Sequence, residues 1–299
     1  NVVNSNANAT QINNVIPSFS SYLGIPAKKS AQITINPNPT ASTTNYALYF
    51  DGVDDYMHVP TVNNVSFGSQ FTIEMYVETG PFTASIHSLF TISRTATDVA
   101  NEALLMLIPS GTGWKLQFWD YSAGYGFPIA SYSNTILQPN QTYHIAFVKN
   151  GLNGTFYVNG EFAGSVTAAR DVYYGNDNVA FGVDYRDMNY NNPRYFNGFM
   201  DEIRLWNVAR TQEEIRTYMN KTLTGQETGL VAYWNFDLQS TPTIALDLTA
   251  NHSNGTLYNG LQTAPFELFP FNWEITLTDK LTNTPLSGKT VYAYDSNGH

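Results

Sequence analysis

The sequence predicts an all-β protein, built as an antiparallel β-sandwich with one short helix. Residues 71–77 (FTIEMYV) and 143–148 (YHIAFV) alternate apolar and polar residues, which is the pattern of a half-buried antiparallel strand. Asn159-Gly160 separates two strand-like halves of residues 154–162, and this dipeptide is the strongest short-range hairpin signal. Many short strands joined by turns favour a sandwich over other all-β folds.

The first 45 residues are expected to be an extended N-terminal linker. They are rich in Asn, Ser and Thr, carry several prolines, and show no helical periodicity. Their one strand-like run is residues 31–35. Residues 46–265 are expected to form a single sandwich domain, in which further strands are predicted at 104–108, 115–119, 179–183, 199–206 and 230–236.

The predicted helix follows Thr211, which with Glu214 forms a capping box. Ile215, Tyr218 and Met219 then recur at helical spacing. The helix is short, and we interpret it as a lid on the edge of the sandwich.

Residues 266–299 are expected to be the truncated start of a second, Ig-like β-sandwich module. Runs 273–278 (WEITLT) and 290–294 (TVYAY) read as strands, and the last residues read as a turn whose returning strand is missing. Because two strands alone are marginally stable, we expect the chain to be a piece of a longer polypeptide.

Composition excludes several classes of function. Lys and Arg number 14 against 24 Asp and Glu, so the net charge of −10 disfavours nucleic-acid binding. There is no cysteine for disulfides or thiolate metal sites, and no run of about 20 apolar residues for membrane insertion. Charged residues make up only 13%, so polar uncharged side chains must cover the surface. An exported, extracellular protein whose signal peptide has been removed, with neutral polar ligands or divalent cations, fits this composition.

Two loops have the composition of a ligand site. Residues 119–127 are rich in aromatic side chains, and residues 184–195 are dense in Tyr, Asn and Arg and long for a hairpin connection. Tyr can stack on the apolar face of a sugar while Asn and Arg bind its hydroxyls, and the same side chains suit a protein partner. A self-packed loop without a ligand is the alternative. The predicted ligand-binding residues are Trp119, Tyr121, Tyr125, Tyr185, Arg186, Tyr190, Arg194 and Tyr195.

Five motifs in order resemble the laminin-G-like (LamG) jelly-roll family of the concanavalin A-like lectin/glucanase superfamily. They are residues 48–56 (LYFDGVDDY), 71–77 (with Tyr76 where Trp is usual), 144–160 (HIAFV and FYVNG), 199–206 (FMDEIRLW) and 229–237 (GLVAYWNFD). Residues 275–288 resemble, more weakly, the Ig-like or carboxypeptidase-regulatory-like repeats of bacterial surface proteins. The resemblance implies a jelly roll of two antiparallel sheets, found in extracellular binding modules and often holding calcium.

Some members of that superfamily are glycosidases, which use paired carboxylates. Glu74 and Glu78 lie on one face of a predicted strand, but the carboxylate that glucanases carry between them is absent. His144 is expected to be a half-exposed sheet residue, and the five histidines form no His-Glu-x-x-His motif. The sequence therefore predicts no enzymatic activity.

Calcium is the favoured cofactor, because it takes oxygen ligands and needs neither Cys nor His. Asp51 and Asp54 sit with Asp55 in a Gly-containing turn, Asp201 lies in the 199–206 motif, and Asp237 ends the closing strand. Opening and closing strands are neighbours in a jelly roll, so Asp51 or Asp54 could share an ion with Asp237. The alternative is that these residues form Asx turns, with Asp201 and Arg204 held in local salt bridges.

Taken together, the resemblance implies a non-enzymatic adhesion or recognition module of a large bacterial surface protein. Its expected partners are a cell-surface glycan or an extracellular protein, together with neighbouring modules of the same polypeptide. It resembles modules of long repeat-built adhesins, including those of gliding bacteria. A structural stalk or virion-fibre component, and an accessory binding module of a polysaccharide-active enzyme, are the alternatives.

Overall fold

A computed structural model of the protein describes residues 31–37, 45–62, 67–93, 102–121, 131–167, 178–185, 194–237, 243–266 and 273–279. The chain divides into two compact units. One is Thr44–Leu268, and the other combines the flanking segments Asn1–Thr43 and Phe269–His299.

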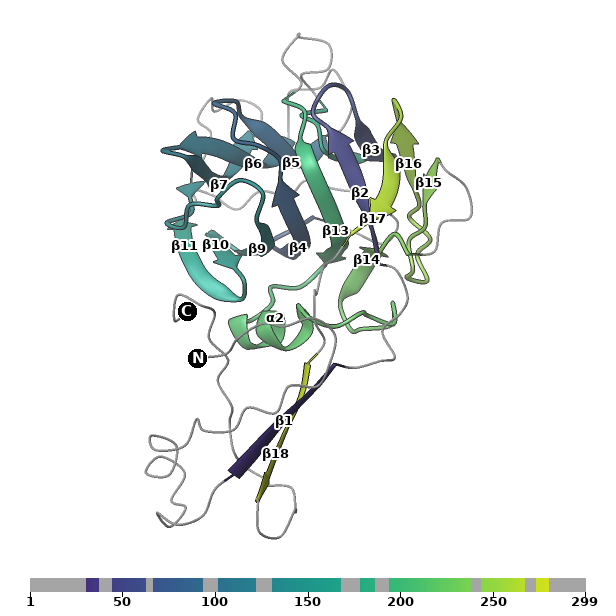
Figure 1. Ribbon diagram of the computed structural model, residues 1–299. Coiled ribbons are helices and arrows are strands. Elements are labelled where there is room, and N and C mark those ends of the chain that lie inside the picture. Colours follow the sequence, from purple (N-terminus) through teal and green to yellow (C-terminus); the bar gives the residue numbers. More distant parts are fainter. Residues whose placement is uncertain are drawn as a thin grey trace. The chain divides into compact units, whose positions relative to one another are not determined.

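The larger unit is an antiparallel sandwich of two eight-stranded sheets, as predicted (Figure 1). Sheet I runs, in spatial order, β11 (Glu161–Thr167), β10 (Asn153–Val158), β9 (Thr142–Asn150), β4 (Gln70–Thr79), β13 (Asn197–Trp206), β2 (Tyr46–Asp51) and β17 (Gln262–Pro265), and β14 (Leu230–Trp234) also pairs with β13. Sheet II runs β15 (Ile244–Ala245), β16 (Gly255–Tyr258), β3 (Tyr56–Val59), β12 (Asn178–Phe181), β5 (His87–Ser93), β6 (Glu102–Ser110), β7 (Gly113–Tyr121) and β8 (Ser131–Tyr132).

Large apolar side chains from both sheets fill the space between them. Phe118 of β7 stacks on Phe147 of β9 with ring centroids 3.9 Å apart, and Phe181 of β12 contacts Trp234 of β14. All four side chains are buried in one continuous cluster. This cluster fixes the distance between the sheets and therefore the position of the outer faces described below.

Two local predictions are confirmed. Asn159 and Gly160 join β10 to β11, and both have positive φ (50° and 74°), as the tight hairpin turn requires. The helix α2 (Gln212–Tyr218) begins after Thr211, whose hydroxyl accepts from the backbone N–H of Glu214 while the Glu214 side chain bonds back to Thr211. Among the described residues, no helix is long and apolar enough to cross a bilayer.

The prediction that β4 and β9 are half-buried needs correction, because both faces of these strands are covered. Nearly every residue of β4 is buried, including Thr72 and Glu74, which alternation assigned to solvent. On the outer face Ile215 of α2 packs against Ala146 and Val148 of β9. The chain that follows β13 thus covers a surface that a period-two pattern marks as exposed.

The smaller unit contains one two-stranded sheet. Strand β1 (Ala31–Pro37) pairs antiparallel with β18 (Trp273–Asp279), from Ala31 opposite Asp279 to Pro37 opposite Trp273. The strand-like run in the predicted linker therefore pairs with a strand that follows the jelly roll, which sequence reasoning had not anticipated.

Candidate functional site

The outer face of sheet II carries a group of aromatic side chains. Met57 and Val59 of β3 point into the core, so the alternating Tyr56 and His58 point away from it. Tyr258 of β16 lies opposite Tyr56, and the two rings are nearly parallel with centroids 4.6 Å apart. These strands therefore present a row of rings rather than a smooth aliphatic surface.

Tyr185, from the segment after β12, completes this row. It stacks on His58 at 4.6 Å with an interplanar angle of 11°, and it also contacts Tyr56. Tyr195 packs on the same cluster. Burial raises the pKa of Tyr56 to about 12, with a further contribution from the neighbouring tyrosines. The Tyr56 phenol is therefore protonated at neutral pH and can donate a hydrogen bond.

Across the same sheet, Trp119 meets Arg194, although Trp119 lies in strand β7 and not in the loop that the sequence predicted to begin there. Leu116 and Phe118 of β7 belong to the core, so Trp119 points outward, where the Arg194 guanidinium lies 5.6 Å from its ring centroid. Arg194 also pairs with the buried carboxylate of Asp184 at 2.6 Å. A cation over an indole is a favourable contact, and here it joins two segments far apart in sequence.

Strand β5 holds the second loop in position. The backbone N–H of Ser88 donates to the carbonyl of Arg194 at 2.8 Å, and Nδ1 of His87 lies 2.7 Å from the carbonyl of Tyr195. Because a carbonyl can only accept, Nδ1 carries the proton, and Nε2 accepts from Thr83. Burial lowers the pKa of His87, which favours this neutral form. The loop base is thus fixed to a rigid sheet.

The outer surface formed by Tyr56, His58, Trp119, Tyr185, Arg194, Tyr195 and Tyr258 is named the aromatic face. Five strand spacings separate β16 from β7, so it extends over roughly 24 Å. It unites four of the predicted ligand-binding residues: Trp119, Tyr185, Arg194 and Tyr195. Tyr125, Arg186 and Tyr190 lie outside the described residues, and of Tyr121 only the backbone, at the end of β7, is described.

Sequence reasoning missed Tyr56, His58 and Tyr258. A signal was available, because Tyr56 and His58 alternate with two apolar residues and so must share one face of a strand. What the sequence could not supply is the pairing of β3 with β16, which brings Tyr258 alongside.

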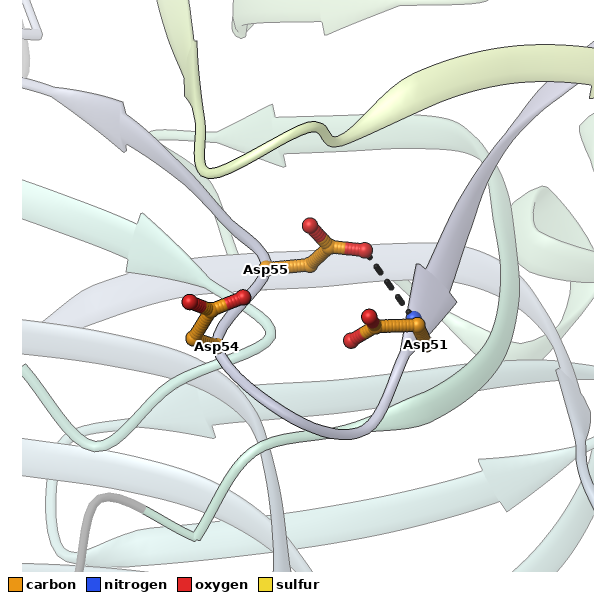
Figure 2. Close-up of side chains that lie close together, drawn as sticks. All are labelled: Asp51, Asp54 and Asp55. Atoms are coloured by element: carbon orange, nitrogen blue, oxygen red, sulfur yellow. Dashed lines mark hydrogen bonds between the residues drawn. The ribbon is translucent and has the colours of Figure 1, made fainter.

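An acidic turn borders the aromatic face. Asp51, Asp54 and Asp55 place carboxylate oxygens within 4.8 Å of one another, and Figure 2 shows all three around the β2–β3 turn. Burial, and then the charges of Asp51 and Asp54, raise the pKa of Asp55 against a lowering backbone hydrogen bond. The charge of Asp54 also contributes, after burial, to the raised pKa of Tyr195. The turn and the aromatic face are therefore electrostatic neighbours.

This turn fits a hard cation. Oxygens that share one calcium ion at 2.3–2.6 Å can be up to about 5 Å apart, which matches the observed spacing. Asp51 Oδ1 accepts from the N–H of Val53, and Asp55 Oδ2 accepts from the N–H of Asp51. These bonds use one oxygen of Asp51 and one of Asp55. The second oxygen of each residue, together with the exposed carboxylate of Asp54, could bind a cation.

The structure does not bring Asp201 and Asp237 to this turn. Asp237 accepts from the backbone N–H of Tyr46, at the opposite end of β2 from Asp51, and five residues of strand span about 17 Å. Asp201 is buried, and its two oxygens accept from Asn45 and from the N–H of Glu202. Asp201 does not form the expected salt bridge with Arg204, because Arg204 pairs with Glu202 instead. An ion shared between Asp237 and Asp51 or Asp54 is therefore incompatible with this geometry.

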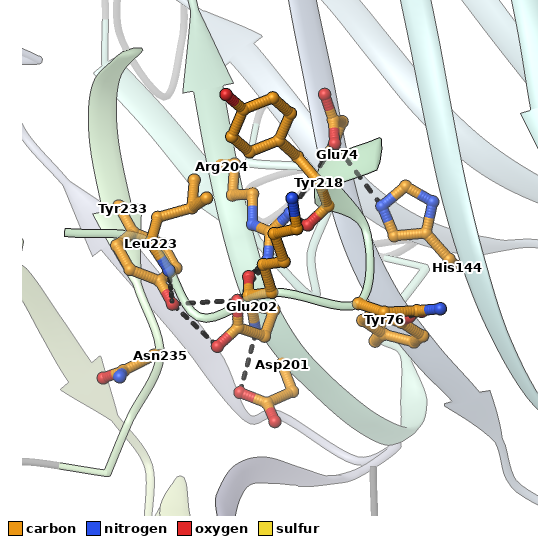
Figure 3. Close-up of polar contacts among 12 residues, drawn as sticks. Glu74, Tyr76, His144, Asp201, Glu202, Arg204, Tyr218, Leu223, Tyr233 and Asn235 are labelled. Carbon is orange, nitrogen blue, oxygen red and sulfur yellow. Dashed lines mark hydrogen bonds and ion pairs between the residues drawn. The ribbon is translucent and has the colours of Figure 1, made fainter. Parts of the chain in front are cut away.

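A second polar cluster lies buried on the outer face of sheet I (Figure 3). Arg204 pairs with Glu202 and donates to the carbonyls of Tyr218 and Lys221 at 2.9 and 2.7 Å. The hydroxyl of Tyr233 donates to Glu202. Burial raises the pKa of Glu202, although Arg204 opposes this. The cluster thus ties the chain after α2 to β13.

Glu74 occupies the other half of this cluster. It accepts from Arg210 at 2.8 Å, and Nε2 of His144 lies 3.5 Å from its second oxygen. Burial acts to raise the pKa of Glu74, but His144, Arg210 and Arg204 outweigh it and hold that pKa below its ordinary value. His144 was expected to be half-exposed and is in fact buried, because α2 and its flanking residues cover β9. Glu74 is therefore a structural carboxylate held by two guanidinium groups.

Residues 50–216 match the Laminin_G_3 family, described as the concanavalin A-like lectin/glucanases superfamily. No curated protein matches the chain.

Several solved structures resemble the chain at low sequence identity. A Bacteroides ovatus protein, provisionally described as carbohydrate binding, is 18% identical with a TM-score of 0.56, over 80% of this chain and 69% of that one. A heptameric SAP-like pentraxin from Limulus polyphemus is 14% identical with a TM-score of 0.47, over 60% and 83% of the two chains. Domain 4 of an extracellular arabinanase from Geobacillus stearothermophilus, solved with arabinotriose, is 20% identical with a TM-score of 0.44, over 62% and 80%.

Proposed function

The chain belongs to the concanavalin A-like lectin/glucanases superfamily, and from that premise we propose that its jelly roll is a non-enzymatic recognition module that binds glycans on the aromatic face. The observation that carries the proposal is the meeting of Trp119, from strand β7, and Arg194, from the segment before β13, on the outer face of the sheet that also carries the stacked rings of Tyr56 and Tyr258.

The chemistry of the aromatic face supports a sugar ligand. Tyr258 is 37% exposed, and Trp119, Tyr185 and Tyr195 are partly exposed, so each offers part of a ring for stacking on a pyranose. The B. ovatus structure, which shares the fold, is itself described provisionally as carbohydrate binding. Because Arg194 is already paired with Asp184, we assign it a positioning role more than a direct contact with ligand.

The burial of Glu74 argues against a catalytic role for this carboxylate. A glycosidase acid must reach the glycosidic oxygen, and its partner carboxylate must reach the anomeric centre or a water. Glu74 is fully buried beneath α2 with both oxygens near cationic or imidazole groups, so a sugar has no access to it.

We place this module at the bacterial cell surface, where it would contribute to adhesion within a larger modular protein. The cysteine-free and charge-poor composition supports export. We further assign calcium to the turn of Asp51, Asp54 and Asp55, whose charges repel one another until a cation neutralises them. Calcium would stiffen the rim of the aromatic face next to Tyr195.

Replacing Tyr258 by alanine is expected to weaken glycan binding about tenfold, since a stacked aromatic contributes roughly 1–1.5 kcal/mol beyond area burial. The ligand would first be identified by applying the chain to a glycan array, and its affinity would then be measured by calorimetry. The thermal midpoint should change little, because Tyr258 is among the more exposed aromatic residues.

Tyr49 provides the matched control. It is 39% exposed, close to the 37% of Tyr258, but it lies on sheet I and contacts Phe199. Its replacement by alanine should leave affinity unchanged. Loss of binding in the Tyr49 variant with retention in the Tyr258 variant would move the site to sheet I, and no binding to any glycan would refute the proposed function.

Calcium is expected to raise the melting temperature of the wild-type chain relative to chelator, because an ion that binds only the folded state stabilises it by mass action. Asp54→Asn should abolish this rise, whereas Asp237→Asn, at the other end of β2, should retain it. A rise that survives Asp54→Asn, or none in the wild type, would contradict the assignment of calcium to this turn.

A further inference from the structure

Along the sequence, the two strands of the β1–β18 ribbon lie on either side of the jelly roll: β1 precedes it and β18 follows it. Strand β1 ends at Pro37, before the jelly roll begins, and β18 starts at Trp273, after it has ended. The two strands pair with each other over their full length. Any tension that reaches Ala31 from one side and Asp279 from the other therefore meets the ribbon before it meets the jelly roll.

The two ends of the jelly roll are themselves held together. Phe266 donates its backbone N–H to the carbonyl of Asn45 at 2.9 Å, and the Asn45 side chain bonds to the carbonyl of Phe266 and to Asp201. Only residues 38–44 and 267–272 then separate this closed end from the ribbon. When the jelly roll is folded, β1 and β18 are therefore linked to one closed end of it by short connections, which limits how far apart the two strands can move.

Folding of the jelly roll has a large effect on the pairing equilibrium of β1 and β18, because it shortens the loop that pairing must close. Without a folded jelly roll, pairing Pro37 with Trp273 closes a loop of 235 residues; with it, 13 connecting residues remain. The probability of loop closure falls as about the 3/2 power of loop length, so the folded domain favours pairing roughly 80-fold. A two-stranded ribbon that is marginal alone becomes stable in this setting.

We propose that the β1–β18 ribbon is a tension-bearing clasp, which is assembled by the folded jelly roll and which keeps pulling forces off it. The clasp is independent of glycan binding. It suits a recognition module in a chain under load, because the ligand-binding face stays undistorted while the ribbon remains paired.

The register determines how the clasp opens. Ala31 and Asp279, where the force enters, are paired with each other at one end of the ribbon. Pulling there separates the strands one pair at a time from that end, rather than shearing all pairs at once. The clasp should therefore open at lower force than the jelly roll, and re-pair when the load falls.

Force spectroscopy on the full chain, held at both ends, tests this order of events. The first extension should release at most about 95 Å, the contour length of residues 31–44 and 267–279, and the much longer jelly-roll extension should follow at higher force. The clasp is refuted if jelly-roll unfolding is the first event or if no short extension precedes it.

Cross-linking tests the register and the coupling separately, on a background with no cysteine. Ile33 lies opposite Leu277, at a separation that suits a disulfide, so I33C/L277C should cross-link on oxidation and should remove both extensions. The control pair I33C/T276C is one residue out of the Ile33–Leu277 register and should not cross-link. In urea that unfolds the jelly roll, the I33C/L277C yield should fall at least tenfold; equal yields in both pairs, or no fall in urea, would overturn the proposal.

Discussion

Replacing Arg204 by alanine is expected to lower the free energy of unfolding by about 3–5 kcal/mol, the usual cost of removing one partner of a buried ion pair. The Arg204 side chain is 1% exposed, and it pairs with Glu202 while donating to the carbonyls of Tyr218 and Lys221. The variant removes the guanidinium from the buried Glu202 carboxylate, which keeps only the Tyr233 hydroxyl, and takes a donor from two backbone carbonyls. Urea unfolding followed by tryptophan fluorescence measures the loss.

Arg216→Ala is the matched control for this experiment. Arg216 pairs with Glu161, but the two side chains are 48% and 70% exposed, so their pair should contribute no more than about 1 kcal/mol. If Arg204→Ala does not fold, Tyr233→Phe removes only the hydroxyl that donates to Glu202 and should cost about 1–3 kcal/mol. Equal losses for Arg204→Ala and Arg216→Ala would show that the buried cluster does not stabilise the sandwich.

Arg194→Ala is expected both to destabilise the protein by about 3–5 kcal/mol and to abolish measurable glycan binding. The Asp184 carboxylate, fully buried, would lose the guanidinium that pairs with it at 2.6 Å. Trp119 would lose the cation above its ring, and β7 would lose its contact with the segment before β13. Affinity by calorimetry and stability by urea unfolding are measured on the same variant.

A double variant separates the two roles of Arg194. Asp184→Asn combined with Arg194→Ala removes the buried carboxylate charge that Arg194 neutralises, so it should recover much of the lost stability. It does not restore the cation over Trp119, so binding should stay weak. Full binding in the double variant would show that Arg194 acts on the aromatic face only through folding stability.

Local features of this fold were predictable because their causes are local. The Asn159-Gly160 turn and the Thr211 capping box each depend on a few adjacent residues, and both lie where the sequence indicates. The order of the family-like motifs also predicted the sandwich. The environment of Glu74 was not predictable in the same way, because the arginine that binds it lies 136 residues later.

The candidate site shows the same division. Composition identified Trp119 and Arg194 as members of two separate ligand-type loops, but their meeting depends on the spatial order of β12, β5, β6 and β7. The acidic turn was predicted with Asp51 and Asp54, whereas the inclusion of Asp237 assumed that neighbouring strands bring all their residues together. Asp237 cannot join the acidic turn, because it binds Tyr46 at one end of β2 while Asp51 lies at the other end.

The covering of sheet I by its own chain limits the valency of the proposed module. The outer surface of β4, β9 and β13 is covered by α2 and by the buried ion pairs. The aromatic face on sheet II is not covered in this way. With one such face among the described residues, the proposed module would engage one ligand segment at a time. Strong attachment to a glycan-coated surface would then come from avidity, as many copies share a surface and the effective concentration of each unbound face rises.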